Sequence, residues 1–581
     1  MKRISTSVRA SDGIAIGRAY VVVRETVQDS AEPAGSVVQE REKFDKALSD
    51  SIVQIAALAE TDDIFAAHLE MVQDDMLRES VEAHIDGGES AIAAVRAAGE
   101  ETAAMFAAID DEYLRAREAD VRDIFARIAA NLTGGVRNPF DGVQEGDIVV
   151  ADTLTPSDMT MIDFTRVRGF VTKEGSATSH VCIIARNRDI PAVVGLHDAA
   201  DAIATGDMLA VDASGGEVVI APDEATLAHY NKAAEEYRAR RRRENESAGR
   251  TFRDGSGRPV HVFANAGDVG EVRAAIAAGA DGIGLFRSEF LYMQSASVPS
   301  EQQQYEAYAA AAEACGGRPL IIRTLDIGGD KALPYLDFGR EENPFLGWRA
   351  IRVSLAMRDM FRRQLRAILR AGAHGDVRIM FPMIVDMEEL RAAKSLLEEC
   401  KAELLREGAA FDGEMKVGVM VETPAAVFIA AALAAECDFF SIGTNDLIHY
   451  IMGIDRNNRH VAYLNEPLHP AVVRSLKRII DAAHREGIGV SVCGELASDP
   501  FGLALLLGMG VDTVSAAPRF VPGMKHLIRH FNAAGCMNLA HSVLLSTDVP
   551  ASKRMVRETL QQSLGHELAF HTTSLFTHSQ P

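Results

Sequence analysis

Hydrophobic positions divide the chain into an N-terminal helical stretch and a long C-terminal half in which strands and helices alternate. Between residues 36 and 133, apolar side chains recur at spacings of three and four, and glycine is sparse. The members of this series are Phe44, Leu48, Ile52, Ile55 and Leu58, followed by Phe65, Leu69, Val72 and Met76. This periodicity predicts a bundle of about four helices.

Short β-branched runs flank the helical stretch on both sides. Residues 1–25 contain GIAIGRAYVVV, and after the helices come DIVVAD, GFVTKEG, PAVVG, DMLAVDA and GEVVIAP. Turn residues bound each run, as is typical of strands. The simplest interpretation is one α/β domain, made of residues 1–25 and 145–222, into which the helical bundle of residues 30–140 is inserted. The densely charged residues 223–254 then predict a solvated linker helix.

The regular alternation over residues 255–581 predicts a (β/α)8 barrel of the TIM type. Eight apolar runs are separated by helical patterns, and they are VHVFAN (260–265), GIGLFR (282–287), LIIRTLDIG (320–328), VRIMFPMI (377–384), KVGVMVET (416–423), FFSIGTND (439–446), GVSVCGE (489–495) and TVSAAP (513–518). The runs are continuously apolar, as expected of parallel strands covered on both faces. The expected fold class is therefore multidomain α/β.

Charge and cysteine content restrict the class of protein. The 581 residues include 60 Lys and Arg against 83 Asp and Glu, a formal net charge of −23, which is unsuited to binding a nucleic-acid backbone. Six scattered cysteines predict reduced thiols rather than disulfides. The first residues lack the apolar core of a signal peptide, and no apolar run reaches the roughly 20 residues of a spanning helix. We therefore expect a cytoplasmic protein that binds neither nucleic acid nor membrane.

Polar and charged residues gather where the predicted barrel strands end, which is where active sites of such barrels lie. They are Arg287, Arg323, Lys331, Glu422, Asn445, Asp446, Arg456 and Cys493. Arginine forks suit a small, multiply anionic ligand. Glu422 and Asp446 suit Mg²⁺, and the cysteine could donate a proton. Any one of these residues could be an ordinary strand-end charge, but their coincidence favours a site.

A second chemical signal is EGSATSHVCIIARNRDIPAVVG, residues 174–195. A Gly-Ser-Ala-Thr-Ser loop precedes His180, and an apolar, helix-like run follows it. His180 is therefore expected near a helix N-terminus, whose free N–H groups and dipole favour an anion. A phosphoryl group carried on its imidazole would be well held there. A capping or surface histidine is the alternative.

These segments resemble a known family. TSHVCIIARNRDIPAVVG is similar to the phosphohistidine motif of phosphoenolpyruvate (PEP)-utilising enzymes. The barrel segments GIGLFRSEFLYM, RTLDIGGDK, NPFLGWRAIR, MVETPAAV, FFSIGTNDLIHYIMGIDRNN and VSVCGELASDP resemble motifs of the enzyme I family, the PEP–protein phosphotransferases of the bacterial sugar phosphotransferase system. DDIFAAHLEMVQDD and ADVRDIFARI resemble that family's carrier-binding domain.

The resemblance implies a role for each residue and a set of partners. His180 would be phosphorylated, Cys493 would protonate the enolate, and Glu422 with Asp446 would bind Mg²⁺. The substrate-binding side chains would be Arg287, Arg323, Asn445, Asp446 and Arg456, with Arg349 and Lys331 adding charge. The acceptor would be a histidine of the carrier HPr, which energises sugar uptake, and the barrels would form a homodimer. The loop departs from the usual Gly-Gly-Arg-Thr-Ser-His, so it lacks a guanidinium near the histidine.

Donor and acceptor sites then lie in different domains. The α/β domain is expected to swivel between barrel and bundle, with residues 223–250 as hinge or connector. A basic carrier would be steered to acidic residues of the bundle, namely Asp62, Asp63, Glu70, Asp74 and Asp75. These carboxylates could equally belong to a solvated helix face.

Three other functions remain open from the sequence. A paralogue could feed a regulatory, nitrogen-type phosphorelay. A PEP synthase or pyruvate–phosphate dikinase would share His180 and the barrel but would need an ATP-binding domain, and no Walker-type glycine loop appears. A catalytically dead scaffold could bind PEP or a carrier, although every catalytic residue type is present.

Overall fold

The chain folds into two units, Met1–Arg238 and Ala239–Pro581. The computed structural model describes the whole chain except residues 7–10, 23–34, 60–63, 108–111, 135–137, 176–181, 183, 186–187, 189, 248–251, 254–256, 258, 294, 296, 329–332, 334, 337, 340, 456–457, 459 and 565–581. Within the described ranges, no helix has the length and apolar character needed to cross a membrane.

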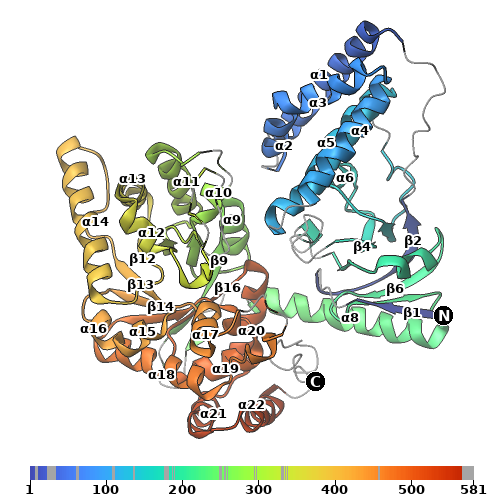
Figure 1. Cartoon of the computed structure of the whole chain (residues 1–581). Helices are drawn as coiled ribbons and strands as arrows, with labels where there is room; N and C mark the ends of the chain where they lie inside the picture. The colour runs from blue at the N-terminus through green and yellow to red at the C-terminus, as the bar shows by residue number, and fades with distance from the viewer. Residues whose placement is uncertain are drawn as a thin grey trace. The chain divides into compact units, whose positions relative to one another are not determined.

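The first unit has a helical part (Figure 1), and a cluster of buried apolar side chains forms the core of that part. Its described helices are α1 (Val37–Ala59), α2 (Ile64–Val72), α3 (Asp75–Asp86), α4 (Ala91–Ala107) and α5 (Glu112–Leu132). Phe44, Ile55 and Phe65 of the predicted apolar series are buried. The described residues hold one helix more than the sequence predicts, because Asp74 accepts a hydrogen bond from the Met76 N–H (2.9 Å) and caps a new helix. Met76 is therefore 74% exposed instead of extending the core series.

A seven-stranded sheet forms the rest of the first unit, with α6 (Pro156–Met161) and the 3₁₀ helix η1 (His197–Ala202) among its connections. The strands lie in the order β1 (Lys2–Ser5), β7 (Glu217–Ile220), β6 (Met208–Asp212), β2 (Ile14–Val21), β3 (Asp147–Ala151), β4 (Val167–Thr172) and β5 (Ala192–Val193). Strand β2 precedes the helices but pairs with β3 in parallel and with β6 antiparallel. The helical bundle is therefore an insertion between strands of one sheet, as the sequence predicts.

The charged segment after the sheet forms one helix, α8 (Glu224–Ser247), and the boundary between the two units falls inside it. In the first unit, Tyr230 is buried and its hydroxyl donates to Glu217 Oε2 at 2.5 Å. In the second unit, Glu244 is 3% exposed and pairs with Arg241 at 3.2 Å. Tyr230 therefore ties α8 to β7 of the sheet, and because Glu244 is also buried the helix is not solvated throughout.

The second unit contains a closed barrel of eight parallel strands, as predicted. They are β9 (Pro259–Ala266), β10 (Ile283–Arg287), β11 (Leu320–Arg323), β12 (Val377–Phe381), β13 (Val417–Val421), β14 (Phe439–Ile442), β15 (Gly489–Val492) and β16 (Thr513–Ala516). Strand β9 pairs with both β10 and β16, which closes the barrel, and the short β8 (Phe252–Arg253) pairs antiparallel with β9.

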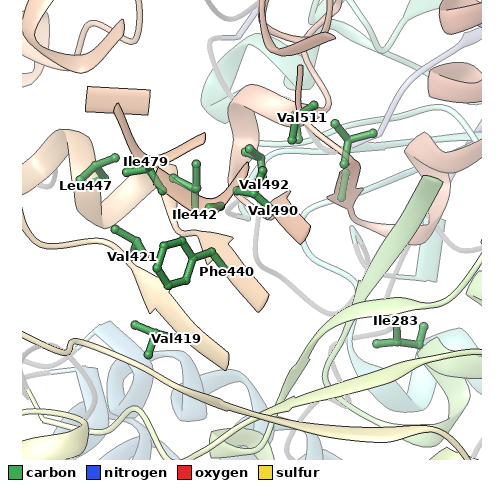
Figure 2. Close-up of a cluster of buried hydrophobic side chains, with 14 of the residues drawn as sticks. Ile283, Val419, Val421, Phe440, Ile442, Leu447, Ile479, Val490, Val492 and Val511 are labelled. Carbon is green, nitrogen blue, oxygen red and sulfur yellow. The ribbon is translucent and has the colours of Figure 1, made fainter. Parts of the chain in front are cut away.

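Helices cover the outside of the barrel. They are α9 (Val269–Ala277), α10 (Glu289–Met293), α11 (Glu301–Ala314), α12 (Ile351–Ala356), α13 (Arg358–Ala371), α14 (Met387–Glu407), α15 (Pro424–Phe428), α16 (Ala430–Ala434), α17 (Thr444–Met452), α18 (Pro470–Arg485), α19 (Pro500–Met509), α20 (Val521–His530), α21 (Ala533–Leu545) and α22 (Val549–Leu564). Figure 2 shows part of the core between helices and strands, with Leu447 of α17 and Ile479 of α18 close to Ile442 of β14. Because side chains on both faces of each strand are buried, the strands read as continuous apolar runs.

Candidate active site at the barrel mouth

A layer of apolar side chains forms the floor of the site inside the barrel. Its members are Phe263, Leu285, Ile321, Met380, Met420, Phe439 and Cys493. Successive side chains of a strand alternate between its faces, so the residue two positions further on points to the same interior, one layer nearer the C-terminal end. After Leu285, Ile321 and Met420, that residue is Arg287, Arg323 or Glu422 respectively. Three predicted site residues therefore face the barrel interior on the mouth side of the apolar floor, among charged side chains that together form the polar layer of the site.

Buried arginines and carboxylates alternate across this layer. Arg323 bonds through Nη2 to Glu289 Oε1 and pairs through Nη1 with Asp326 Oδ2 at 3.1 Å. Asp326 also takes two hydrogen bonds from Arg349, from Nε (2.9 Å) and from Nη2 (3.1 Å). Arg349 Nη2 lies 3.3 Å from Asp446 Oδ2. The two arginines are 5% and 2% exposed, so each is held in one orientation by charged hydrogen bonds.

Glu422 is 1% exposed and lies among other carboxylates. Its Oε1 accepts a hydrogen bond from the Met383 N–H at 2.8 Å, and Met383 has the left-handed φ of 58°, a strained backbone conformation for this residue. Burial, and then the carboxylates of Asp446 and Asp326, raise the pKa of Glu422 to about 8. A Cβ on Gly443 would lie 2.6 Å from Glu422 Oε2, so glycine leaves this oxygen uncovered.

These observations fit a divalent cation at Glu422 and Asp446. Within the described residues, no group of three or more His, Cys, Asp or Glu side chains is arranged to hold a metal. Mg²⁺ does not need such a group, because it is usually bound by one or two carboxylates together with water and substrate oxygens. The carboxylates around Glu422 that raise its pKa repel one another, and a bound cation would offset that repulsion.

Cys493 directly follows β15, and Asn445 lies in the first turn of α17, the helix that follows β14. The Cys493 N–H donates to the Ile442 carbonyl at 3.1 Å, and its Sγ lies 3.6 Å from the same oxygen. Burial raises the pKa of the Cys493 thiol to about 11, so at neutral pH it keeps the proton that a donor needs. The Glu495 N–H donates to Asn445 Oδ1 at 3.1 Å, which joins the two turns at the mouth.

Of the remaining predicted residues, the structure describes Arg287 alone. Arg287 ends β10, half-buried, with its guanidinium carbon 5.0 Å from the centroid of the Phe290 ring. Three further predictions lie outside the described residues, namely His180, Lys331 and Arg456. Sequence reasoning missed Glu289, whose only signal was a carboxylate two positions after a strand-end arginine.

The predicted acidic face of the bundle is described only in part. Asp62 and Asp63 lie outside the described residues, as do the side chains of Glu70 and Asp75. Asp74 is described, and it caps α3.

Comparison with known proteins assigns the whole arrangement to one family. Three family models match in chain order: PEP-utilising enzyme, N-terminal, at residues 6–117; the mobile domain at residues 143–216; and the PEP-binding domain at residues 242–533. The phosphoenolpyruvate-protein phosphotransferase of Enterococcus faecalis is 39% identical over 561 residues, covering 94% of this chain and 98% of that protein. The chain belongs to the phosphoenolpyruvate–protein phosphotransferase family of PEP-utilising enzymes.

Other members of this phosphotransferase family match over similar lengths. The protein of Haemophilus influenzae is 39% identical over 575 residues, covering 96% of this chain and 99% of its own. That of Geobacillus stearothermophilus is 41% identical over 538 residues, covering 90% and 92%. A solution NMR structure of an Enzyme I protein is 36% identical and covers 40% of this chain and 99% of its own, with a TM-score of 0.34.

Proposed function

We propose that the protein is a PEP–protein phosphotransferase that takes the phosphoryl group of PEP onto His180, releases pyruvate, and passes the group to a histidine of HPr or an HPr-like carrier. In the sugar phosphotransferase system this transfer energises sugar uptake. The observation that carries the proposal is the buried set of arginines and carboxylates at the barrel mouth, in a chain that belongs to this family over nearly its whole length.

The arginines bind the anionic ends of PEP. Arg287 and Arg323 end the neighbouring strands β10 and β11, and Asn445 lies in the first turn of α17. Arg456 is the fourth side chain of this set. Arg323 and Arg349 are already fixed by buried carboxylates, so little reorientation is needed when the substrate enters. Lys331 and Arg349 add positive charge around the triply anionic substrate.

His180 is the nucleophile and Cys493 is the acid. An unprotonated imidazole nitrogen attacks phosphorus in line. Such a nitrogen is available near neutrality, because the reference pKa of a histidine side chain is about 6.5. The leaving enolate takes the thiol proton of Cys493 and becomes pyruvate. When bound at Glu422 and Asp446, Mg²⁺ supplies charge neutralisation for the phosphoryl and enolate oxygens. The surrounding apolar floor keeps water from the enolate.

The carrier meets the phosphohistidine at the helical bundle. The α/β domain made of residues 1–25 and 145–222 carries His180, so it swivels between the PEP site and the carrier bound to residues 30–140. Residues 223–254 connect it to the barrel of residues 255–581. An acidic bundle face attracts a basic carrier, and low ionic strength strengthens that attraction.

We further infer a homodimer formed by barrel domains in a cytoplasmic protein. Support comes from large apolar side chains exposed in segments that follow barrel strands: Leu346 is 66% exposed, Phe428 72% and Tyr463 67%. Light scattering of the protein and of Phe428→Glu tests this, with a dimer expected for the first and a loss of dimer for the second. Equal masses for wild type and Phe428→Glu would show that Phe428 does not lie in a dimer interface.

Incubation with ³²P-labelled PEP and Mg²⁺, followed by a chase with purified HPr, tests the function. Label is expected on the wild type and then on HPr, and none on His180→Ala. Label that moves only to a nitrogen-type carrier would favour the regulatory phosphorelay instead. Label from ATP and inorganic phosphate would favour the PEP synthase or dikinase alternative, and no label at all would favour a scaffold.

A further inference from the structure

The first barrel strand, β9, contributes one further side chain, that of Asn265, to the polar layer of the site. Asn265 stands two positions after Phe263 of the apolar floor, so it faces the barrel interior one layer nearer the mouth. The same count places Arg287, Arg323 and Glu422 in this layer. Asn265 therefore faces the barrel interior near the mouth end of β9, beside Cys493.

Two hydrogen bonds fix the orientation of the Asn265 amide. Its Nδ2 donates to the Cys493 carbonyl at 2.9 Å, and its Oδ1 accepts from Ser515 Oγ at 2.6 Å. Ser515 is fully buried, and a Cβ on Gly284 would lie 2.6 Å from its Oγ. Gly284 thus leaves the space that the hydroxyl occupies. The amide oxygen faces Ser515, so the amide nitrogen is held toward Cys493.

The contact anchors the peptide group that follows the proton donor. On its N-terminal side, Cys493 is held by its N–H bond to the Ile442 carbonyl. On its C-terminal side, the next residue is Gly494, whose backbone has the widest conformational freedom. The bond from Asn265 restrains the carbonyl between these two residues. With both ends of Cys493 held, the direction of its Cα–Cβ bond is set, and its Sγ lies 3.6 Å from the Ile442 carbonyl oxygen.

We propose that Asn265, oriented by Ser515, is the positioning residue that aims the Cys493 thiol at one face of the enolate; this inference rests on the proposed function. In the step, the S–H bond breaks and a C–H bond forms at C3 of the enolate. The enolate C–O group becomes the carbonyl of pyruvate, and the thiolate takes back a proton from water. Loss of the anchor leaves phosphoryl transfer intact but uncouples it from directed protonation.

The test separates the two steps in single turnovers of the full-length protein. PEP labelled with ³²P reports phosphorylation of His180, and PEP with deuterium at one defined C3 position, used in tritiated water, gives pyruvate whose methyl configuration reports the protonated face. Wild type should give one configuration. Asn265→Leu and Ser515→Ala should give a mixture approaching racemic. Their directed protonation should slow by about tenfold or more, because small misplacements of a reacting group cost that much, while phosphorylation of His180 stays near the wild-type rate.

Ser491→Ala is the matched control, because it removes a buried hydroxyl bond of the neighbouring strand β15, from Ser491 Oγ to the Phe440 carbonyl at 3.2 Å. It should keep a single methyl configuration. Ser515→Ala serves as the independent variant if Asn265→Leu does not fold. Wild-type stereochemistry in both variants, with His180 labelled, would overturn the inference alone. No label on His180 of the wild type would overturn the proposed function and the inference with it.

Discussion

Replacing Glu422 with Gln should stabilise the metal-free barrel at neutral pH while removing the cation site. Below pH 4.5 the carboxyl is protonated in both the folded and the unfolded chain, so it has no effect on stability. As the pH rises from 4.5 towards 8, the unfolded chain releases this proton while the folded chain keeps it. The folded state therefore loses stability with rising pH, by about 1.4 kcal/mol for each pH unit. At about pH 7.5 the cost reaches roughly 4 kcal/mol.

Glutamine lacks this titration and keeps an oxygen for the Met383 N–H bond. Glu422→Gln should therefore unfold at a higher urea concentration than wild type at about pH 7.5, by at most roughly 4 kcal/mol, and match it near pH 4.5. Trp348 is the only tryptophan in the sequence, and it adjoins Arg349 of the site, so its fluorescence reports barrel unfolding.

Magnesium should reverse the order of stability of wild type and Glu422→Gln. Added Mg²⁺ is expected to stabilise the wild type and leave Glu422→Gln nearly unchanged, since a ligand that binds only the folded state adds stability by mass action. Equal urea midpoints for the two proteins at both pH values, without metal, would refute the raised pKa of Glu422. Equal stabilisation of both by Mg²⁺ would refute its assignment as a ligand.

Three further substitutions test the charge network and the proton donor. Arg349→Met should destabilise the barrel by about 3–5 kcal/mol, because it breaks the buried ion pairs of this arginine with Asp326 and Asp446; an unfolding midpoint in urea near that of wild type, followed by Trp348 fluorescence, would contradict this. Glu289→Gln should raise the KM for PEP by roughly tenfold, since Arg323 loses a charged partner worth at least about 1.4 kcal/mol, and steady-state kinetics with an unchanged KM would count against this role. Gly494→Ala should slow pyruvate formation in a lactate dehydrogenase-coupled assay, because its Cβ would lie 1.8 Å from a hydroxyl oxygen of α17; wild-type turnover would contradict it.

The barrel could be predicted because its physical signal is local. Each strand is a continuous apolar run, and the run ends at the polar residue that faces the mouth, as with Arg287 and Glu422. The bundle was predicted less well. The apolar spacing continues from Phe65 to Met76, but the helix does not: α2 ends at Val72, and Asp74 caps a new helix, α3. A capping side chain changes the helix count without changing the spacing.

The partners inside the site could not be predicted, because they are set by register between distant strands. Glu289 and Arg323 are 34 positions apart, and Asn265 and Cys493 are 228 apart. Each pair meets only because the closed barrel aligns strand ends at one height. The motif resemblance supplied the residue types, but not which carboxylate holds which arginine.

Mapping the phosphoryl group after one turnover with ³²P-labelled PEP and Mg²⁺ tests the central claim most directly. The account predicts one acid-labile, base-stable phosphoryl group on His180, formed together with an equal amount of pyruvate and absent from His180→Ala. Pyruvate formed without labelling of His180, or label on a different residue, would contradict it.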